Sequence, residues 1–161
     1  MSTLPSPLRL KRSVVISTRV ESVEDAPEAE ATPINSRVAW REAEEDPRDW
    51  RIELEVTFGE QDGEIYTPYH GAVEVALEME VHPGFPEEQI EPLIRVNGTS
   101  LAYGIVREVV ANLTARGPHG VYLLPSISFV EPPGKPEEAK KSPDAKAKPG
   151  RKKAPAKKSA S

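Results

Sequence analysis

Strict alternation between apolar and charged residues is the feature that most constrains this chain. In residues 50–58 every second residue is apolar and most of the residues between are charged, and residues 73–81 largely repeat the pattern. A period of two places alternate side chains on opposite faces of a β-strand, so both segments are predicted strands with one face in the core. Weaker alternation predicts further strands over residues 8–20 and 35–41, and Gly71 is typical of a bulge or bend.

The connections between these segments are mostly too short for the crossovers that parallel strands need, so an antiparallel meander is predicted. Pro86 and the two glutamates after it suit the first turn of a short helix. Pro92 is predicted to end that helix, because a proline disfavours helical geometry in the residue before it. Residues 93–96 are then predicted to be extended, and residues 97–98 to form a turn.

A longer helix is predicted next, with Thr99 or Ser100 as its cap and Gly117-Pro118 as its end. Its apolar residues recur with the helical period at Leu101, Ile105, Val106, Val109, Val110 and Leu113. The apolar residues 121–129 are predicted to pack across the domain as an extended segment. The predicted fold class is therefore α+β, a four-stranded antiparallel meander sheet followed by a short and a long helix.

Charge divides the chain into two parts. Residues 1–130 contain 11 Lys and Arg against 22 Asp and Glu, whereas residues 131–161 contain 10 against 4. Beyond Val130 no apolar residue is larger than alanine or proline, so little burial can offset the entropy of ordering the chain. The sequence predicts one domain over residues 1–130 and a disordered, basic Lys/Ala/Pro-rich tail over residues 131–161.

Several classes of protein are excluded by what the sequence lacks. It has no cysteine, so thiolate catalysis, zinc-thiolate sites and disulfides are ruled out. No apolar run is long enough to span a bilayer, and no signal peptide is evident, so a cytoplasmic protein is expected. His70, His82 and His119 lie in different predicted elements, which argues against a metal site. No nucleophile or phosphate-binding motif is present, so neither an enzyme nor a cofactor is expected.

Aromatic side chains bind extended peptides well, so a polypeptide-binding surface in this chain would have four aromatic candidates: Trp40, Tyr66, Tyr69 and Tyr103. Trp50 and Phe58 are in phase with the apolar face of their strand, which favours a place in the core. Tyr66 and Tyr69 differ in parity, so they cannot both point inward from an unbulged strand.

After residue 86, an Arg-Val-Asn-Gly segment precedes an apolar helix with an Arg-Glu pair, and a Leu-Leu-Pro-x-Ile-x-Phe segment follows it. This order of motifs resembles the SecB family of bacterial export chaperones. Four strands before these motifs extend the resemblance over the acidic body of the chain. The residues that resemble the family are Leu93, Ile94, Arg95, Val96, Asn97, Gly98, Leu101, Tyr103, Arg107, Glu108, Leu124, Pro125 and Phe129.

The resemblance implies a homotetramer, a dimer of dimers in which sheets and long helices supply the contacts. It also implies an ATP-independent holdase, a chaperone that keeps unfolded or precursor polypeptides from folding or aggregating and hands them to the SecA motor for export. Glu21 aligns with an acidic position through which family members contact SecA, whereas the companion position is Ser17. A SecB-like chaperone dedicated to another client, such as an antitoxin, is an open variant.

A nucleic-acid-associated protein is the alternative from a different class. The basic tail can bind nucleic acid by releasing counterions from the phosphate backbone. It can equally be a solubilising extension that folds back on the acidic body. The candidate contacts to nucleic acid are Lys148, Arg151, Lys152, Lys153, Lys157 and Lys158.

Overall fold

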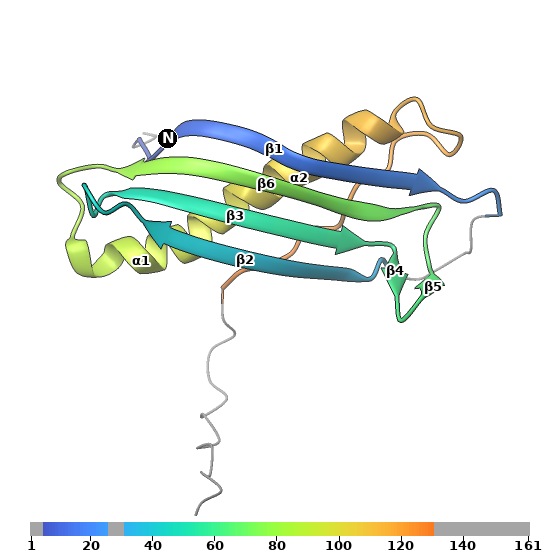
Figure 1. Ribbon diagram of the computed structural model, residues 1–161, viewed down its shortest axis with the longest axis horizontal. Helices are drawn as coiled ribbons and strands as arrows, with labels where there is room; N and C mark the ends of the chain where they lie inside the picture. Colours follow the sequence, from blue (N-terminus) through green and yellow to red (C-terminus); the bar gives the residue numbers. More distant parts are fainter. Residues whose placement is uncertain (1–4, 26–30, 131–161) are drawn as a thin grey trace, which may run out of the picture. The chain divides into compact units, whose positions relative to one another are not determined.

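The computed structural model describes residues 5–25 and 31–130. The described residues form a sheet with a long helix across one of its faces (Figure 1). The predicted tail of residues 131–161, with its candidate contacts to nucleic acid, lies outside the described residues.

The main sheet has four strands, which are all antiparallel to their neighbours, as predicted. They are β1 (Leu8–Ser22), β2 (Ile34–Glu42), β3 (Asp49–Phe58) and β6 (Tyr69–Val81). A small hairpin of β4 (Glu60–Gln61) and β5 (Glu64–Ile65) lies between β3 and β6 along the chain.

The order of strands across the sheet is β1-β6-β3-β2, which corrects one part of the predicted meander. Strands β2, β3 and β6 do follow one another through turns. β1 comes directly before β2 in the chain but pairs with β6 instead. The strand order is that of a Greek key, in which one strand lies on the far side of a three-stranded meander. β1 and β2 are consequently the two edge strands.

The two faces of the sheet differ sharply. The inner face, which packs against the helix, contains the fully buried side chains of Ile52, Leu54, Val75 and Leu77. The outer face is formed by the alternate residues of the same strands, and it is rich in glutamates and arginines. This division confirms the alternation in residues 50–58 and 73–81. Phe58 is 1% exposed and belongs to the core as favoured, and Trp50 packs against the core half-buried.

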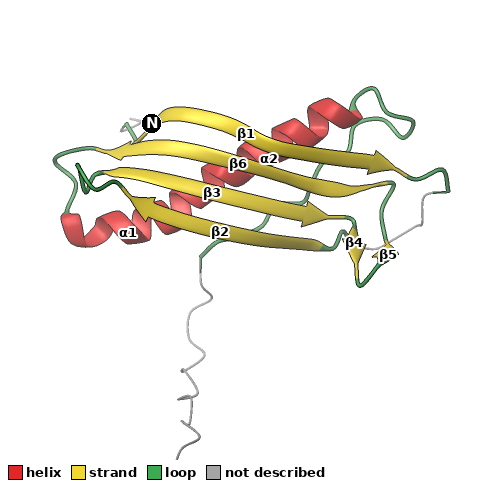
Figure 2. Ribbon diagram, viewed as in Figure 1, coloured by secondary structure: helices red, strands yellow, loops and turns green. Residues whose placement is uncertain are grey.

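The helical region is continuous from residue 87 to residue 114 (Figure 2). It begins with a 3₁₀ turn, η1 (Glu87–Gln89), followed by α1 (Ile90–Leu93), a π-helical turn, η2 (Ile94–Gly98), and α2 (Thr99–Thr114). The predicted extended segment at residues 93–96 and the predicted turn at residues 97–98 are therefore wrong. The predicted cap is also wrong, since no side chain caps α2 and Ser100 Oγ donates to the Val96 carbonyl at 2.7 Å.

Packing explains why the helix does not stop at Pro92 or at Gly98. Pro92 is the third residue of α1, and the N–H groups of a helix's first turn have no partner within the helix, so a proline costs little there. Gly98 is buried against the sheet, and a Cβ placed on it would lie 2.4 Å from Ile52 Cδ1. The absence of a side chain at residue 98 thus lets the helix approach the core closely.

Residues 121–130 form no strand and pack across the domain alongside α2, as the predicted extended segment should. Leu124 is fully buried. The backbone on either side of its peptide bond is fixed by two side chains of α2: Arg107 Nε donates to the Leu124 carbonyl at 2.9 Å, and the Tyr103 hydroxyl donates to the Pro125 carbonyl at 2.7 Å. The last described residues are thereby brought beside β2.

Candidate functional site

An open apolar groove lies along the free edge of the sheet, and we call it the edge groove. Its volume is about 650 Å³, compared with about 350–440 Å³ for four other depressions among the described residues. Three segments that are distant in sequence form its walls. They are β2 with Ser36, Val38 and Trp40, the irregular helix with Pro92, Arg95 and Val96, and the final segment with Phe129 and Val130.

The π-helical turn shapes one wall of the edge groove. Arg95 and Val96 belong to this turn, in which the backbone is wider than in an α-helix. The neighbouring residues Ile94 and Gly98 are buried against the sheet. Because one side of the turn is fixed in the core, the other side presents Val96 to the groove.

Trp40 is held in place on β2 by two contacts. Its indole Nε1 donates to Thr99 Oγ1 at 3.0 Å, and the Arg95 guanidinium lies 4.4 Å from the centre of its ring. Arg95 is itself hydrogen bonded to Glu91 through Nε at 2.8 Å. A cation over an aromatic face stabilises both partners, so the indole is presented to the groove in one orientation.

Phe129 is positioned by Tyr103. Their ring centres are 5.9 Å apart in an edge-to-face arrangement, which suits the charge distribution of aromatic rings. Phe129 is half-buried and Val130 is exposed, so this wall of the groove is apolar and open to solvent. The arrangement can therefore bind an apolar chain by burial of its side chains.

No protein-family model matches this sequence, and no curated protein matches it. Solved structures do match the fold. The SecB-like chaperone Rv1957 of Mycobacterium tuberculosis, solved in complex with a ChAD peptide from the Rv1956 HigA1 antitoxin, superimposes with a TM-score of 0.54 at 16% identity. The match covers 74% of this chain and 90% of that chain. The chain has a SecB-like fold. A protein of unknown function from Streptococcus agalactiae also matches, with a TM-score of 0.45 at 11% identity, over 74% of this chain and 97% of that one.

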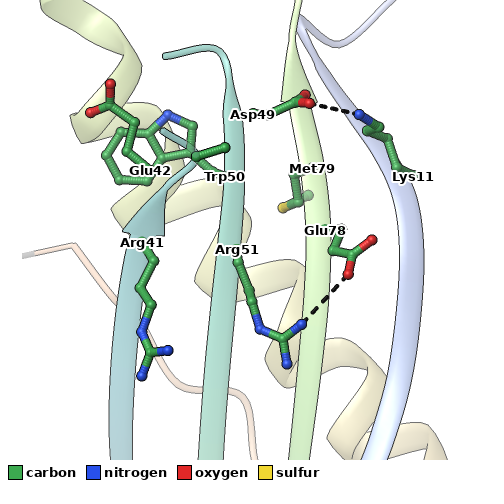
Figure 3. Close-up of a pocket in the computed structure, with 9 residues that line it drawn as sticks. Lys11, Arg41, Glu42, Asp49, Trp50, Arg51, Glu78 and Met79 are labelled. Atoms are coloured by element: carbon green, nitrogen blue, oxygen red, sulfur yellow. Dashed lines mark hydrogen bonds and ion pairs between the residues drawn. The ribbon is translucent and has the colours of Figure 1, made fainter. Parts of the chain in front are cut away.

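The outer face of the SecB-like sheet is lined by charges that are paired with one another. Figure 3 shows the end of this face, where Lys11 Nζ lies 2.8 Å from Asp49 Oδ2 and Arg51 lies 3.5 Å from Glu78. A hydrogen bond from Arg51 lowers the pKa of Glu53, and the hydrogen bond with Asp49 raises the pKa of Lys11. Both shifts favour the charged forms. Within the described part of the chain, no three His, Asp or Glu side chains are grouped so that they could bind a metal.

The predicted polypeptide-binding residues have separate places in the SecB-like domain. Trp40 lines the edge groove, but Tyr69 and Tyr103 are only 3% and 4% exposed. These two predictions are corrected, because both hydroxyls are used internally: Tyr69 accepts from the His119 N–H and Tyr103 donates to Pro125. Tyr66 is half-buried near the β4–β5 hairpin, where its hydroxyl donates to Glu64.

Glu21, the predicted contact to SecA, lies near the end of β1 on the outer face. Its carboxylate is 3.8 Å from Arg19 and 3.8 Å from His70 Nε2. Ser17, the companion position, donates to Glu74 at 3.4 Å. The negative charge of Glu21 therefore has a cation beside it. In the part of the chain that is described, no helix is long and apolar enough to cross a membrane.

Of the eight residues that line the groove, only Trp40 was a predicted site residue. The seven that sequence reasoning missed are Ser36, Val38, Pro92, Arg95, Val96, Phe129 and Val130. Arg95, Val96 and Phe129 were named for the family resemblance, but no local pattern assigned them to a shared site. The helix that presents Arg95 and Val96 was predicted to be extended at those residues. A signal was present in the alternation of Val38 and Trp40 on one face of β2.

Replacing Tyr103 by phenylalanine is expected to lower the free energy of unfolding by about 1 kcal/mol, the usual net value of one hydrogen bond. Burial raises the pKa of Tyr103, so its neutral form is favoured in the folded protein. The stabilisation that the Tyr103 hydroxyl contributes to the folded protein is thus fully present below a pH of about 10, the pKa of an unfolded tyrosine. It is lost as the pH rises through the raised pKa of Tyr103 in the folded protein. Urea unfolding of both proteins at neutral and alkaline pH should show the difference narrowing. A difference that does not depend on pH contradicts this account.

Proposed function

We propose that the protein is an ATP-independent holdase chaperone that binds apolar segments of unfolded or precursor polypeptides in the edge groove. The proposal rests on one observation, an open apolar groove at a free edge of a SecB-like sheet. Burial of apolar surface has no directional requirement, so one groove can accept many sequences. The bound antitoxin peptide in the SecB-like chaperone of Mycobacterium tuberculosis supports a role in binding polypeptides.

Suppression of aggregation tests the proposal directly. A chemically unfolded client is diluted into buffer with and without the purified protein, in the absence of ATP, and light scattering is followed. The scattering from the aggregating client is expected to fall as the amount of the protein approaches that of the client.

The mass of the protein's own assembly is measured separately, by size-exclusion chromatography with light scattering. A monomer that leaves aggregation unchanged contradicts the proposal.

We propose the assembly to be a homotetramer, a dimer of dimers, because two exposed apolar surfaces remain on the domain. One is on β1, an edge strand on which Val15 and Ile16 are 45% and 46% exposed. The other is a ridge on α2 with a spacing of four residues, Leu101, Ile105, Val109 and Leu113, in which Leu101 and Leu113 are 44% and 52% exposed. Such ridges pack into the grooves of a second helix.

Replacing Leu113 by aspartate is expected to halve the mass of the assembly at micromolar concentration. Burial of one leucine is worth about 1.5–3 kcal/mol, so its loss weakens each contact at least about tenfold. Size-exclusion chromatography with light scattering provides the mass. Ile65→Asp is the matched control, because Ile65 is exposed on β5, away from α2. Equal masses for the wild type and the Leu113 variant would remove the α2 ridge from the proposed interface.

A cytoplasmic chaperone of this kind could serve either of two purposes: export of its clients through SecA, or protection of one dedicated client. Export through SecA uses the outer face and Glu21, so Glu21→Lys should weaken binding to purified SecA while aggregation is still suppressed. A chaperone dedicated to one client, such as an antitoxin, should instead protect that client far better than an unrelated unfolded protein. Binding to SecA and protection of two unrelated clients separate these outcomes.

A nucleic-acid-associated function remains the second candidate because residues 131–161 contain 10 Lys and Arg against 4 Asp and Glu. Binding through such a tail should be strongly dependent on salt. A gel shift that disappears when residues 131–161 are deleted would support it. Retained suppression of aggregation in the same truncated protein would assign the chaperone function to the domain.

A further inference from the structure

The outer edge of β2 has backbone groups that point away from the sheet. Two hydrogen bonds beyond the ends of the strand fix their direction: Ala43 N donates to Asp49 O at 2.8 Å, and Gly59 N donates to Pro33 O at 3.0 Å. The register between β2 and β3 is unbroken between these pairs. In an antiparallel pair, hydrogen-bonded and non-hydrogen-bonded residues alternate, so the odd-numbered residues of β2 bond to β3. The N–H and C=O groups of Ser36, Val38 and Trp40 therefore face outward.

Those same three residues line the edge groove with their side chains. Among the described residues, no neighbouring segment forms a hydrogen bond to their backbone N–H or C=O groups. An extended chain laid along β2 would thus find backbone partners and an apolar wall at the same positions. Residues of that chain opposite Val38 and Trp40 would point into the groove, because directly opposed residues in a sheet share a face.

The odd-numbered residues of β2 place two arginines on the outer face at the free edge of the sheet. Arg37 and Arg41 project onto the outer face, and their side chains are 87% and 68% exposed. Each has an acidic neighbour on β3, Glu55 at 3.4 Å and Glu53 at 3.6 Å. Figure 3 shows Arg41 beside Arg51 on this face, with the free edge of the sheet on the far side of Arg41. A strand added at this edge would have every second side chain on the outer face of the sheet, next to Arg37 and Arg41.

We propose that the client segment binds as an added β-strand on β2, with apolar residues directed into the groove and acidic residues between them. This inference rests on the proposed holdase function and names the class of segment that the groove selects. Backbone hydrogen bonds provide sequence-independent affinity in this mode, and the alternate side chains provide preference.

A second copy of the chain is a poor occupant of this edge. Two β2 strands paired with each other would bring Arg37 and Arg41 of both copies onto one outer face. The β2 side chains on the outer face of the sheet are those of Asn35, Arg37, Ala39 and Arg41. Neither β2 strand would therefore contribute a carboxylate to that face. Like charges on neighbouring strands are destabilising. An unfolded client with alternating apolar and acidic residues has the complementary charge.

Labelled peptides of nine residues, the length of β2, test the charge preference by fluorescence anisotropy. A peptide that alternates leucine with glutamate should bind about tenfold more tightly than one that alternates leucine with lysine. The double variant Arg37→Gln, Arg41→Gln should lose this preference. The matched control is Arg9→Gln, which removes an exposed arginine from the outer face at the opposite edge and should keep it. Equal affinity of the wild type for both peptides overturns the charge preference.

Methylation of single backbone nitrogens in the leucine-glutamate peptide tests the added strand. Each methyl group removes one donor and leaves every side chain in place. Affinity should fall about tenfold at every second residue and change little at the residues between, because only alternate N–H groups of a paired strand face β2. If methylation lowers the affinity equally at every residue, or at none, strand addition is overturned. It is also overturned if adding the peptide lowers the mass of the protein assembly, because this would show that a second copy occupies the β2 edge.

These outcomes are distinguishable from failure of the proposed function. Peptides that bind in the groove without sensitivity to methylation leave the holdase intact and remove only the added strand. Failure to bind either peptide, together with failure to suppress aggregation, removes both.

Discussion

Replacing Val96 by aspartate is expected to weaken binding of an unfolded client at least about tenfold. Val96 is half-buried in the wall of the edge groove, where a bound chain would cover it. Loss of a buried valine costs about 1.5 kcal/mol or more, and 1.4 kcal/mol is a factor of ten in affinity. The new carboxylate adds the cost of losing its hydration beneath the client. Titration of a labelled, permanently unfolded client by fluorescence anisotropy measures the change.

Val121→Asp is the matched control for this experiment. Val121 is 60% exposed and lies outside the edge groove, and the substitution removes the same side chain and adds the same charge. The control should bind the client like the wild type. Circular dichroism should show that both variants are folded. If the two variants bind equally well, the edge groove is not where clients bind.

Replacing Gly71 by alanine is expected to lower the free energy of unfolding by about 3 kcal/mol, near the upper end for a residue forced into filled space. A Cβ at this position would lie 1.9 Å from the Arg19 carbonyl oxygen and 3.0 Å from Val20 Cα. Both atoms belong to the backbone of β1, which cannot turn aside as a side chain can. β1 must therefore move away from β6 and lose ladder hydrogen bonds around Val20. Urea unfolding measures the loss, and hydrogen exchange of residues 18–22 shows where it occurs.

Gly104→Ala should have the opposite effect on stability. Gly104 lies in α2 with no atom within 4 Å of the position of a new Cβ, and alanine is favoured over glycine within a helix by about 1 kcal/mol. A Gly71 variant as stable as the wild type would mean that β1 is not held closely against β6.

The strands could be predicted because their alternation reflects burial directly. β3 and β6 lie in the middle of the sheet with one face on the core, so every second residue must be apolar. The neighbour of β1 could not be predicted in this way. Alternation tells which side chains are inside, and it does not tell which strand lies beside which.

The helix was harder to predict because local signals and tertiary packing disagree between residues 92 and 98. A proline and an Asn-Gly pair favour a break, and the isolated segment would follow them. In the folded protein Ile94 and Gly98 are buried against the sheet, and this packing keeps the backbone helical through a π turn. Burial overrides weak local preferences here.

The groove could not be predicted as a site because no one segment contains it. Trp40, Val96 and Phe129 come together only when β2, the π turn and the final segment have packed. Tyr69 and Tyr103 matched the expected chemistry of a polypeptide contact equally well from sequence. Only their place in the fold shows that they support the core.

The unequal edges of the sheet limit how far copies of this protein can join. A sheet that accepts copies at both edges grows into an open fibre, whereas one that accepts them at a single edge closes after one two-fold pairing. In the assembly proposed above, Arg37 and Arg41 would disfavour pairing of two β2 edges, and the exposed apolar residues of β1 would leave the opposite edge for a second copy. If clients bind β2 as proposed, the same two arginines would keep copies of the protein from polymerising through the strand that is left free for the client.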